Sequence, residues 1–228
     1  MGERYGDGKN KKHKSSFFSH PRSPHPPSLP PSIHSHHPPL AIHSTLPAQL
    51  ANLECNAVSA VALSHHFLQR LVAAGKPGCI VLTSSAAAAI ASPFTALYAA
   101  TKAFVSSFGA SLAVEARHRG VDVLVFHPSP VASRFYDKAH RLDVLDFFKG
   151  VAVHPDALPP RVFGAVGRTV WRDVGSTALG FRLLMKVVDY NLMATLTALA
   201  APLLPDFKRA VAAGGGGAGG SGKGKKAA

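Results

Sequence analysis

Two short runs of branched apolar residues, separated by one long helical pattern, constrain the fold of this chain most. The first run is CIVLTSS at 79–85 and the second is VDVLVFH at 121–127, and each is typical of a strand buried on both faces. Between them, apolar residues recur at helical spacing from about Thr95 to His118, and Gly120 stands where a helix-ending glycine is common. A strand, a crossover helix and a second strand predict a βαβ unit, so the sheet is expected to be parallel.

Further elements are expected on both sides of this unit. Residues 48–74 carry apolar residues at three- and four-residue spacing, and the sequence GKPG ends that pattern. Downstream, residues 156–171 predict a helix and VGSTA at 174–178 predicts an edge strand. Residues 178–201 predict one amphipathic helix with a single polar stripe, formed by Arg182, Lys186 and Asp189. That helix either packs on the sheet or lies at a membrane surface, and these charges argue against a membrane span.

Composition divides the chain into a core and two tails. Residues 1–47 hold nine of the 18 Pro and seven of the 13 His, and residues 208–228 are mostly Gly, Ala and Lys. We expect both tails to be disordered, because neither can build a hydrophobic core. One domain is therefore expected over about 48–207. The net charge of +13 is distributed as +4 on the first tail, +4 on the core and +5 on the second tail.

This charge distribution favours loose contact with anionic surfaces, membranes among them, over specific nucleic-acid recognition. The core has few basic clusters and no motif that reads nucleic acid. Cys55 and Cys79 are expected in the apolar core without metal or disulfide spacing, which indicates a reducing compartment. We expect no secretory signal peptide, a structural role for His127, and no metal site, the HSHH stretch at 34–37 included.

One group of polar residues has the spacing of an active site. Tyr98 and Lys102 are four residues apart on the long helical pattern, so both project from one face. Ser85 ends the preceding strand, thirteen residues before Tyr98. Ligands of open parallel sheets bind at the carboxyl ends of strands, so these side chains can meet in one crevice. Asn56, in the preceding helix, could face the same crevice. Alone, each of these residues could equally be an ordinary helix or strand-end residue.

As a set, these residues resemble the C-terminal half of a short-chain dehydrogenase/reductase. The resemblance rests on Asn56, then IVLTSS with Ser85, then YAATKAF with Tyr98 and Lys102, then VDVLVFHPSPVASRF. It covers about residues 48–207. Within the family, YAATKAF and VASRF are most similar to the very-long-chain 3-oxoacyl-CoA reductase and 17β-hydroxysteroid dehydrogenase type 12 branch. The general family has Pro-Gly where this chain has Pro128 and Ser129.

The resemblance implies a role for each candidate catalytic residue. Tyr98 would exchange a proton with the substrate carbonyl, and Lys102 would lower the pKa of that phenol, which is ordinarily about 10. Ser85 would hydrogen-bond the carbonyl oxygen, and Asn56 would hold a water in a proton relay. Cofactor contacts are implied for six residues: Tyr98, Lys102, Pro128, Ser129, Val131 and Ser133.

The implied function is NADP-dependent reduction of a 3-oxoacyl-CoA or a ketosteroid-like carbonyl in lipid metabolism. NADPH is the implied cofactor, although the residues that choose between NADP and NAD follow a strand that this sequence does not show. Small-molecule acyl-CoA or steroid-like substrates are the implied partners. Membrane-surface association and a homodimer are further expectations.

Other parts of the family pattern are missing. The family begins with a glycine-rich turn after its first strand and carries Asn-Asn-Ala-Gly after its fourth, and neither motif is found. We therefore expect an α/β fold: a partial Rossmann-type, doubly wound parallel sheet without the N-terminal nucleotide-binding strands, with an exposed edge. Two interpretations remain open. The chain is either an incomplete product of a reductase gene or a truncated, catalytically inactive binding module, and negligible NADPH binding is expected of it.

The chain ends in KKAA, with lysines three and four positions from the end. This pattern resembles the dilysine retrieval signal of endoplasmic-reticulum membrane proteins, which a receptor reads from the cytosol. The cytosolic face of the endoplasmic reticulum is therefore the expected location, with the cytoplasm as the alternative.

Overall fold

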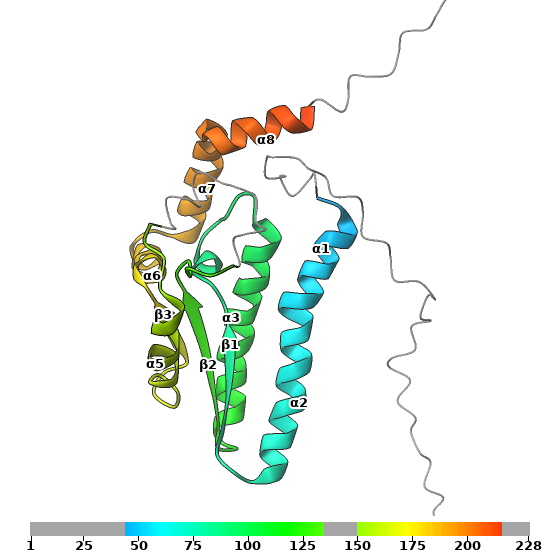
Figure 1. Cartoon of the computed structure of the whole chain (residues 1–228), viewed down its shortest axis with the longest axis vertical. Helices are drawn as coiled ribbons and strands as arrows, with labels where there is room; N and C mark the ends of the chain where they lie inside the picture. Colours follow the sequence, from blue (N-terminus) through cyan, green and yellow to red (C-terminus); the bar gives the residue numbers. More distant parts are fainter. Residues whose placement is uncertain (1–43, 135–149, 216–228) are drawn as a thin grey trace, which may run out of the picture. The chain divides into compact units, whose positions relative to one another are not determined.

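A computed structural model of the chain describes residues 44–134 and 150–215 (Figure 1). Disorder is expected for 1–47 and 208–228, and residues 1–43 and 216–228 of these tails lie outside this part. The expected boundaries are wrong, because helix α1 (Leu46–Leu53) begins inside the first range and helix α8 (Pro205–Gly215) extends into the second. The described residues form a parallel sheet with the order β1 (Gly78–Thr83), β2 (Val121–Pro128) and β3 (Trp171–Val174). Helix α3 (Ala96–Arg117) makes the crossover from β1 to β2. The predicted α/β architecture and parallel sheet are confirmed.

The helix expected at 48–74 is present, with one irregularity. It consists of α1 (Leu46–Leu53) and α2 (Ser59–Ala74), joined by a π-helical turn at Glu54–Val58. Gly75 ends α2 in the left-handed conformation, with φ of +61°. Such π-turns are common at functional sites, and this one contains Asn56.

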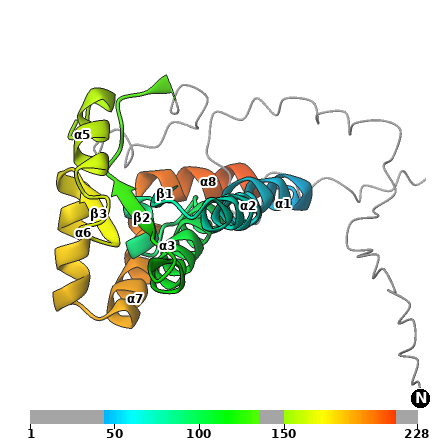
Figure 2. The same cartoon turned by 90° about the horizontal axis from the view of Figure 1, so that it is seen from below.

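The main hydrophobic core lies between the sheet and helices α2 and α3 (Figure 2). Buried side chains of alternate strand residues meet small residues of α3 here: Ile80, Leu82, Val121, Val123, Val125, Val105, Ala113 and Ala116. On the opposite face, Leu124 of β2 packs against Val162 and Ala165, on and just after helix α5 (Leu158–Phe163). That helix does not cover β1, where Cys79 and Val81 are exposed. The expectation that both cysteines are buried is wrong, since Cys55 also lies on the surface.

Gly109 lets α3 approach β2 closely. A Cβ at this position would lie 2.3 Å from Val125 Cγ2 and 2.8 Å from Leu82 Cδ1. Replacing a helical Gly by Ala ordinarily stabilises a helix by roughly 0.5–1 kcal/mol. Overpacking of a tight core costs about 1–3 kcal/mol, so we expect Gly109→Ala to lower the free energy of unfolding. Urea unfolding followed by circular dichroism measures this change.

Gly180 provides the matched control for this substitution. It is a helical glycine on α6 (Ser176–Val187), and a Cβ there would meet no atom within 4 Å. Gly180→Ala is therefore expected to stabilise the protein slightly. Equal effects at the two positions would contradict the close packing of α3 on β2.

The C-terminal elements differ from those expected. The helix predicted over 156–171 is short, because Trp171–Val174 pairs with Val125–Pro128 as strand β3. The edge strand predicted at 174–178 is therefore misplaced: the observed strand begins three residues earlier and ends four residues earlier. Its second residue, Gly175, has φ of +98°, and a Cβ there would lie 2.5 Å from Ser129 Oγ. The chain turns at this glycine, and α6 begins at Ser176.

The single helix predicted over 178–201 is two helices. Helix α6 ends at Val187 and α7 (Tyr190–Ala200) begins after Asp189, with a bend of 113° between the two helical segments. Asp189 causes the break, because its carboxylate accepts hydrogen bonds from the backbone N–H groups of Asn191 and Leu192. Asp189 therefore caps α7 and does not extend a polar stripe. A 3₁₀ turn (Ala201–Leu203) and helix α8 (Pro205–Gly215) follow.

One described helix, α3, is long and apolar enough to cross a membrane by length and composition. Seven of its residues are buried, and it packs against β2 and β1. This apolar character is accounted for by the core of the sheet.

Candidate active site

The carboxyl end of β1 and the first turns of α3 bring the predicted residues together. Ser85 follows β1 and caps a 3₁₀ turn (Ala86–Ala89), with its Oγ accepting a hydrogen bond of 3.2 Å from the Ala87 N–H. The chain then returns into α3, where Tyr98 lies in the first turn. The Tyr98 and Ser85 side chains are hydrogen-bonded to each other. Two residues predicted from spacing alone therefore meet.

Lys102 lies one turn further along α3, beside Tyr98. Its Nζ is 5.6 Å from the centroid of the Tyr98 ring. The same ammonium donates a hydrogen bond of 3.1 Å to the backbone carbonyl of Thr83, the last residue of β1. This bond ties α3 to the strand end that precedes Ser85. The role of Thr83 is not predictable from the sequence, because a backbone acceptor leaves no signal in the residue type.

Burial dominates the electrostatics of the pair. Partial burial raises the pKa of Tyr98 above its usual value, and the hydrogen bond from Ser85 partly opposes this rise. Burial also lowers the pKa of Lys102, partly opposed by the nearby Cys55. The expected lowering of the Tyr98 pKa by Lys102 is therefore not found here, because loss of water around the phenol outweighs other effects. Tyr98 is a neutral phenol at neutral pH, which makes it a proton donor.

Asn56 lies in the π-helical turn, which packs against α3. Its side-chain amide donates to the backbone carbonyl and the side-chain oxygen of Asn52, at 3.1 and 3.2 Å. Its neighbour Cys55 is close enough to influence the charge of Lys102. The segment that carries Asn56 therefore lies near Lys102, while the Asn56 amide is hydrogen-bonded within its own helix.

The four residues expected at the nicotinamide follow β2 and have different surroundings. Pro128 ends β2 opposite Val174 of β3. Ser129 is buried, and its Oγ accepts a hydrogen bond of 2.9 Å from the Ala178 N–H in α6. Val131 forms an isolated bridge with Val153, and the exposed Ser133 donates its N–H to the Val131 carbonyl at 2.8 Å. The hydroxyl of Ser129 therefore holds α6 in place.

A buried chain of hydrogen bonds supports the backbone at Lys102. The Lys102 carbonyl oxygen accepts hydrogen bonds of 2.8 Å from the hydroxyls of Ser84 and Ser106, whose Oγ atoms are 2.7 Å apart. Ser106 Oγ is also 2.9 Å from Nε2 of the buried His127. The network fixes the position of Lys102 relative to β1 and β2. In the sequence, this network is visible only as two serines, one next to Ser85 and the other one turn after Lys102.

His127 connects this network to the sheet edge. Its Nδ1 lies 3.8 Å from Asp173 Oδ1, and Asp173 in turn forms a two-point ion pair with Arg182 at 2.8 and 2.9 Å. Arg182 stacks 4.4 Å from the centroid of the Trp171 ring. Burial, reinforced by the positive charge of Arg182, lowers the pKa of His127 to about 4. The imidazole is therefore neutral at neutral pH, and its expected structural role agrees with this burial.

The described residues fit one end of a nicotinamide cofactor. An ammonium has three donors, so Lys102 can bind ribose hydroxyls while it keeps the Thr83 carbonyl. Tyr98 and Ser85 lie beside it at the carboxyl end of β1, where ligands of open parallel sheets bind. Within residues 44–134 and 150–215, no glycine-rich turn between a strand and a helix is present to hold a pyrophosphate.

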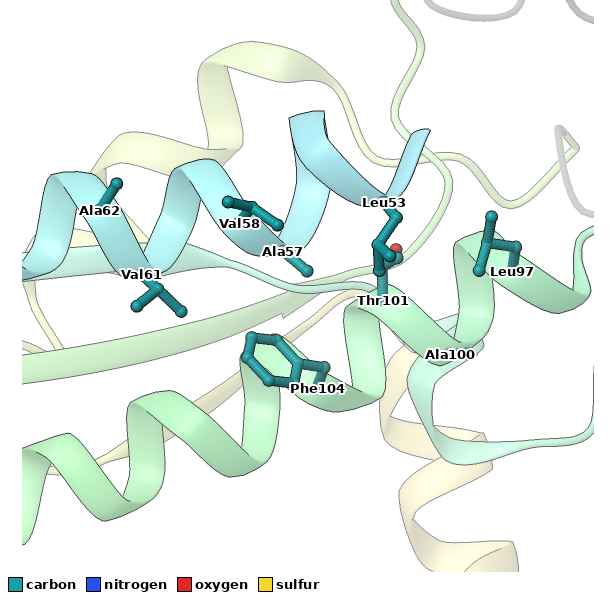
Figure 3. A pocket seen from close by; sticks show the side chains of 9 residues that line it. All are labelled: Leu53, Ala57, Val58, Val61, Ala62, Leu97, Ala100, Thr101 and Phe104. Atoms are coloured by element: carbon teal, nitrogen blue, oxygen red, sulfur yellow. The ribbon is translucent and has the colours of Figure 1, made fainter. Parts of the chain in front are cut away.

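A groove of about 450 Å³ lies between the α1–α2 segment and α3 (Figure 3). Its lining is apolar apart from one threonine: Leu53, Ala57, Val58, Val61, Ala62, Leu97, Ala100, Thr101 and Phe104. None of the predicted site residues lines this groove. It is therefore a surface separate from the Ser85–Tyr98–Lys102 group.

Comparisons with known proteins find relatives of this chain in sequence and in fold. Residues 43–142 match the family described as short chain dehydrogenase, and this stretch contains all eight candidate site residues. The uncharacterized oxidoreductase YbbO of Escherichia coli is 35% identical over 81 residues, which are 34% of this chain and 30% of the relative. The chain therefore spans less than a third of this curated relative.

Solved structures show the same fold. A short chain dehydrogenase from Burkholderia cenocepacia, in complex with NADP, has a TM-score of 0.56 and 20% identity, covering 73% of this chain and 64% of that one. The 3-hydroxyacyl-CoA dehydrogenase type-2 of Mycobacterium avium has a TM-score of 0.51 and 16% identity, covering 58% and 57%. Residues 43–142 are therefore similar in sequence to the short chain dehydrogenase family, and the described residues share the fold of these solved structures.

Proposed function

We propose that this chain carries the proton-donating end of an NADP-dependent oxidoreductase. The proposed substrate is the carbonyl of a 3-oxoacyl-CoA or a ketosteroid-like molecule in lipid metabolism. One observation carries the proposal: the partly buried phenol of Tyr98 is hydrogen-bonded to Ser85 and has the Lys102 ammonium 5.6 Å from its ring. The choice of substrate and of NADP rests on the resemblance of YAATKAF and VASRF to the acyl-CoA reductase branch.

In this proposal the chain's residues prepare a carbonyl for reduction. Tyr98, a neutral phenol at neutral pH, donates its proton to the carbonyl oxygen. Ser85 hydrogen-bonds the same oxygen and stabilises the charge that develops there. Lys102 holds the ribose hydroxyls and stabilises the phenolate that remains. The cofactor, when bound, supplies the hydride.

Four further features belong to the proposal. Asn56 holds a water that returns a proton toward Tyr98, and Pro128, Ser129, Val131 and Ser133 border the nicotinamide. Of these, Ser129 acts through its backbone carbonyl, because its hydroxyl is bonded to α6 and its N–H donates to the Val174 carbonyl. The proposed enzyme is a homodimer, for which the uncharged groove on α3 offers apolar surface. Its proposed location is the cytosolic face of the endoplasmic reticulum, supported by the KKAA terminus, which lies outside the described residues.

A second candidate function is a binding module without catalytic activity. It is favoured by the absence of a glycine-rich turn from the part of the chain that the structure describes. In this case the exposed side chains of β1, Cys79 and Val81, belong to a partner-binding surface.

An activity assay distinguishes the two functions. The chain, and a version extended by the coding sequence directly upstream in its gene, are incubated with NADPH and a 3-oxoacyl-CoA, and loss of NADPH absorbance is followed. Fluorescence titration measures NADPH binding by each form, and we expect little binding by the chain alone. We expect turnover in the form that binds NADPH. A form that binds NADPH but reduces neither 3-oxoacyl-CoA nor a ketosteroid would contradict the proposed substrates. Failure of both forms to bind NADPH would favour the binding module.

A further inference from the structure

Helix α7 and the turn after it expose a continuous stripe of leucines. Leu192, Leu196, Leu199 and Leu203 follow one another at four-, three- and four-residue spacing, so they lie on one helical face. Their exposed fractions are 51, 50, 70 and 71%. The other side of α7 is partly covered, at Met193, Ala194 and Thr197. Nothing among the described residues covers the leucine face.

The composition of α7 is unusual for a solvent-exposed helix. None of its eleven residues is charged, and none is fully buried. Surface helices of globular proteins ordinarily turn charged residues to water. The bend before α7 adds two more exposed apolar residues, Val187 at 87% and Tyr190 at 56%. A contiguous apolar surface of this kind usually marks an interaction site.

Positive charge borders this surface along the chain. Lys186, just before the bend, and Lys208, early in α8, are both exposed. The nearby acidic groups are already engaged: Asp189 caps α7, and the buried Asp206 pairs with Arg209 at 3.3 Å. Residues 208–228 contain five basic and no acidic residues, within a chain of net charge +13. An apolar face bordered by cations is complementary to an anionic lipid surface.

We propose that α7 lies in the surface of an anionic phospholipid bilayer. The leucine stripe would enter the acyl boundary, with Lys186 and Lys208 among the headgroups. The stripe covers twelve residues, or about 18 Å at ~1.5 Å per residue, which is too short to cross a hydrocarbon core of about 30 Å. The bend of 113° prevents α6 and the α7 segment from forming one straight span. The helix therefore lies on the membrane, and this inference is independent of the proposed enzymatic activity.

Vesicle flotation tests the proposal on the full chain. We expect the protein to float with vesicles of phosphatidylcholine and phosphatidylserine, and much less with phosphatidylcholine alone. The double variant Leu196→Glu and Leu199→Glu should lose at least tenfold in partitioning. Lys186→Gln and Lys208→Gln should each weaken binding to the anionic vesicles about fivefold, the effect of one basic residue near such a surface.

A matched control uses an apolar residue that is equally exposed elsewhere. Val114 on α3 is 77% exposed, so Val114→Glu should leave flotation unchanged. Far-ultraviolet circular dichroism checks that each variant is folded. A second measurement needs no destabilising change: Leu199→Cys, in a Cys55→Ser and Cys79→Ser background, is labelled with a polarity-sensitive fluorophore. Its emission should shift to the blue on anionic vesicles.

Two results would overturn the proposal. One is flotation that the α7 variants leave unchanged, together with no shift of the fluorophore. The other is light scattering that shows a dimer which Leu196→Glu and Leu199→Glu dissociate, because the stripe would then be covered by a second copy of the chain.

Discussion

Replacing Tyr98 by Phe is expected to lower the turnover of the proposed reductase about a hundredfold to ten-thousandfold, the usual contribution of a positioned general acid. The substitution removes the phenolic proton and the hydrogen bond to Ser85, and keeps the ring beside Lys102. The affinity for NADPH should change little, since Lys102 and the strand end remain. Single-turnover measurement of NADPH oxidation with a 3-oxoacyl-CoA, in the form that binds NADPH, checks this result.

Tyr190 offers the matched control, because it is exposed on α7, outside the Ser85–Tyr98–Lys102 group. Tyr190→Phe should retain full turnover. If Tyr98→Phe also retained it, another group would have to supply the proton, and the assignment of Tyr98 as the acid would be wrong. A loss of turnover that came with a loss of NADPH affinity would instead indicate that Tyr98 mainly holds the cofactor.

Acidification is expected to destabilise the protein through His127. The pKa of this imidazole is about 4 in the folded protein and near 6.5 in an unfolded chain, because burial and Arg182 disfavour its charge. At pH 7 both states are neutral. As the pH falls from about 6.5 to 4, the unfolded chain binds the proton first, so folding stability falls by about 3 kcal/mol. Urea unfolding at a series of pH values measures this loss.

The contribution of His127 is separated by substitution. His127→Gln keeps a group that can bond Ser106 and removes the titration, so its stability should decline less between pH 6.5 and 4, although it is less stable at pH 7. His154→Gln is the control, since that side chain is 72% exposed. Parallel pH profiles for the native protein and His127→Gln would show that His127 is not responsible for the acid sensitivity.

Local sequence patterns were sufficient for the central elements. The parallel β1–α3–β2 unit was predicted from the branched apolar runs around Ile80 and Val123 and from the helical pattern between them. Such a prediction is possible because buried strands and helices each have a characteristic pattern of apolar residues along the chain. The C-terminal elements lie elsewhere than their local patterns predict. Trp171–Val174 became a strand through pairing with β2, and Asp189 ended a helix that its apolar pattern would have continued. The strand pairing depends on a distant segment, which residue spacing does not reveal. The Asp189 cap is a local contact, and an Asp before an apolar run is its signal in the sequence.

The candidate site was likewise predictable in part from residue spacing and in part set by tertiary contacts. Residue spacing along the chain is enough to place Tyr98 and Lys102 on one helix face, because backbone periodicity decides which side chains point the same way. It also places Ser85 close to the end of the preceding strand, which ends at Thr83 in the structure. Only the tertiary structure decided that Lys102 bonds to the Thr83 carbonyl, that the pKa of Tyr98 rises, and that Cys55 and Cys79 are exposed. Hydrogen-bond partners and loss of water depend on which segments pack together, and those segments are far apart along the chain.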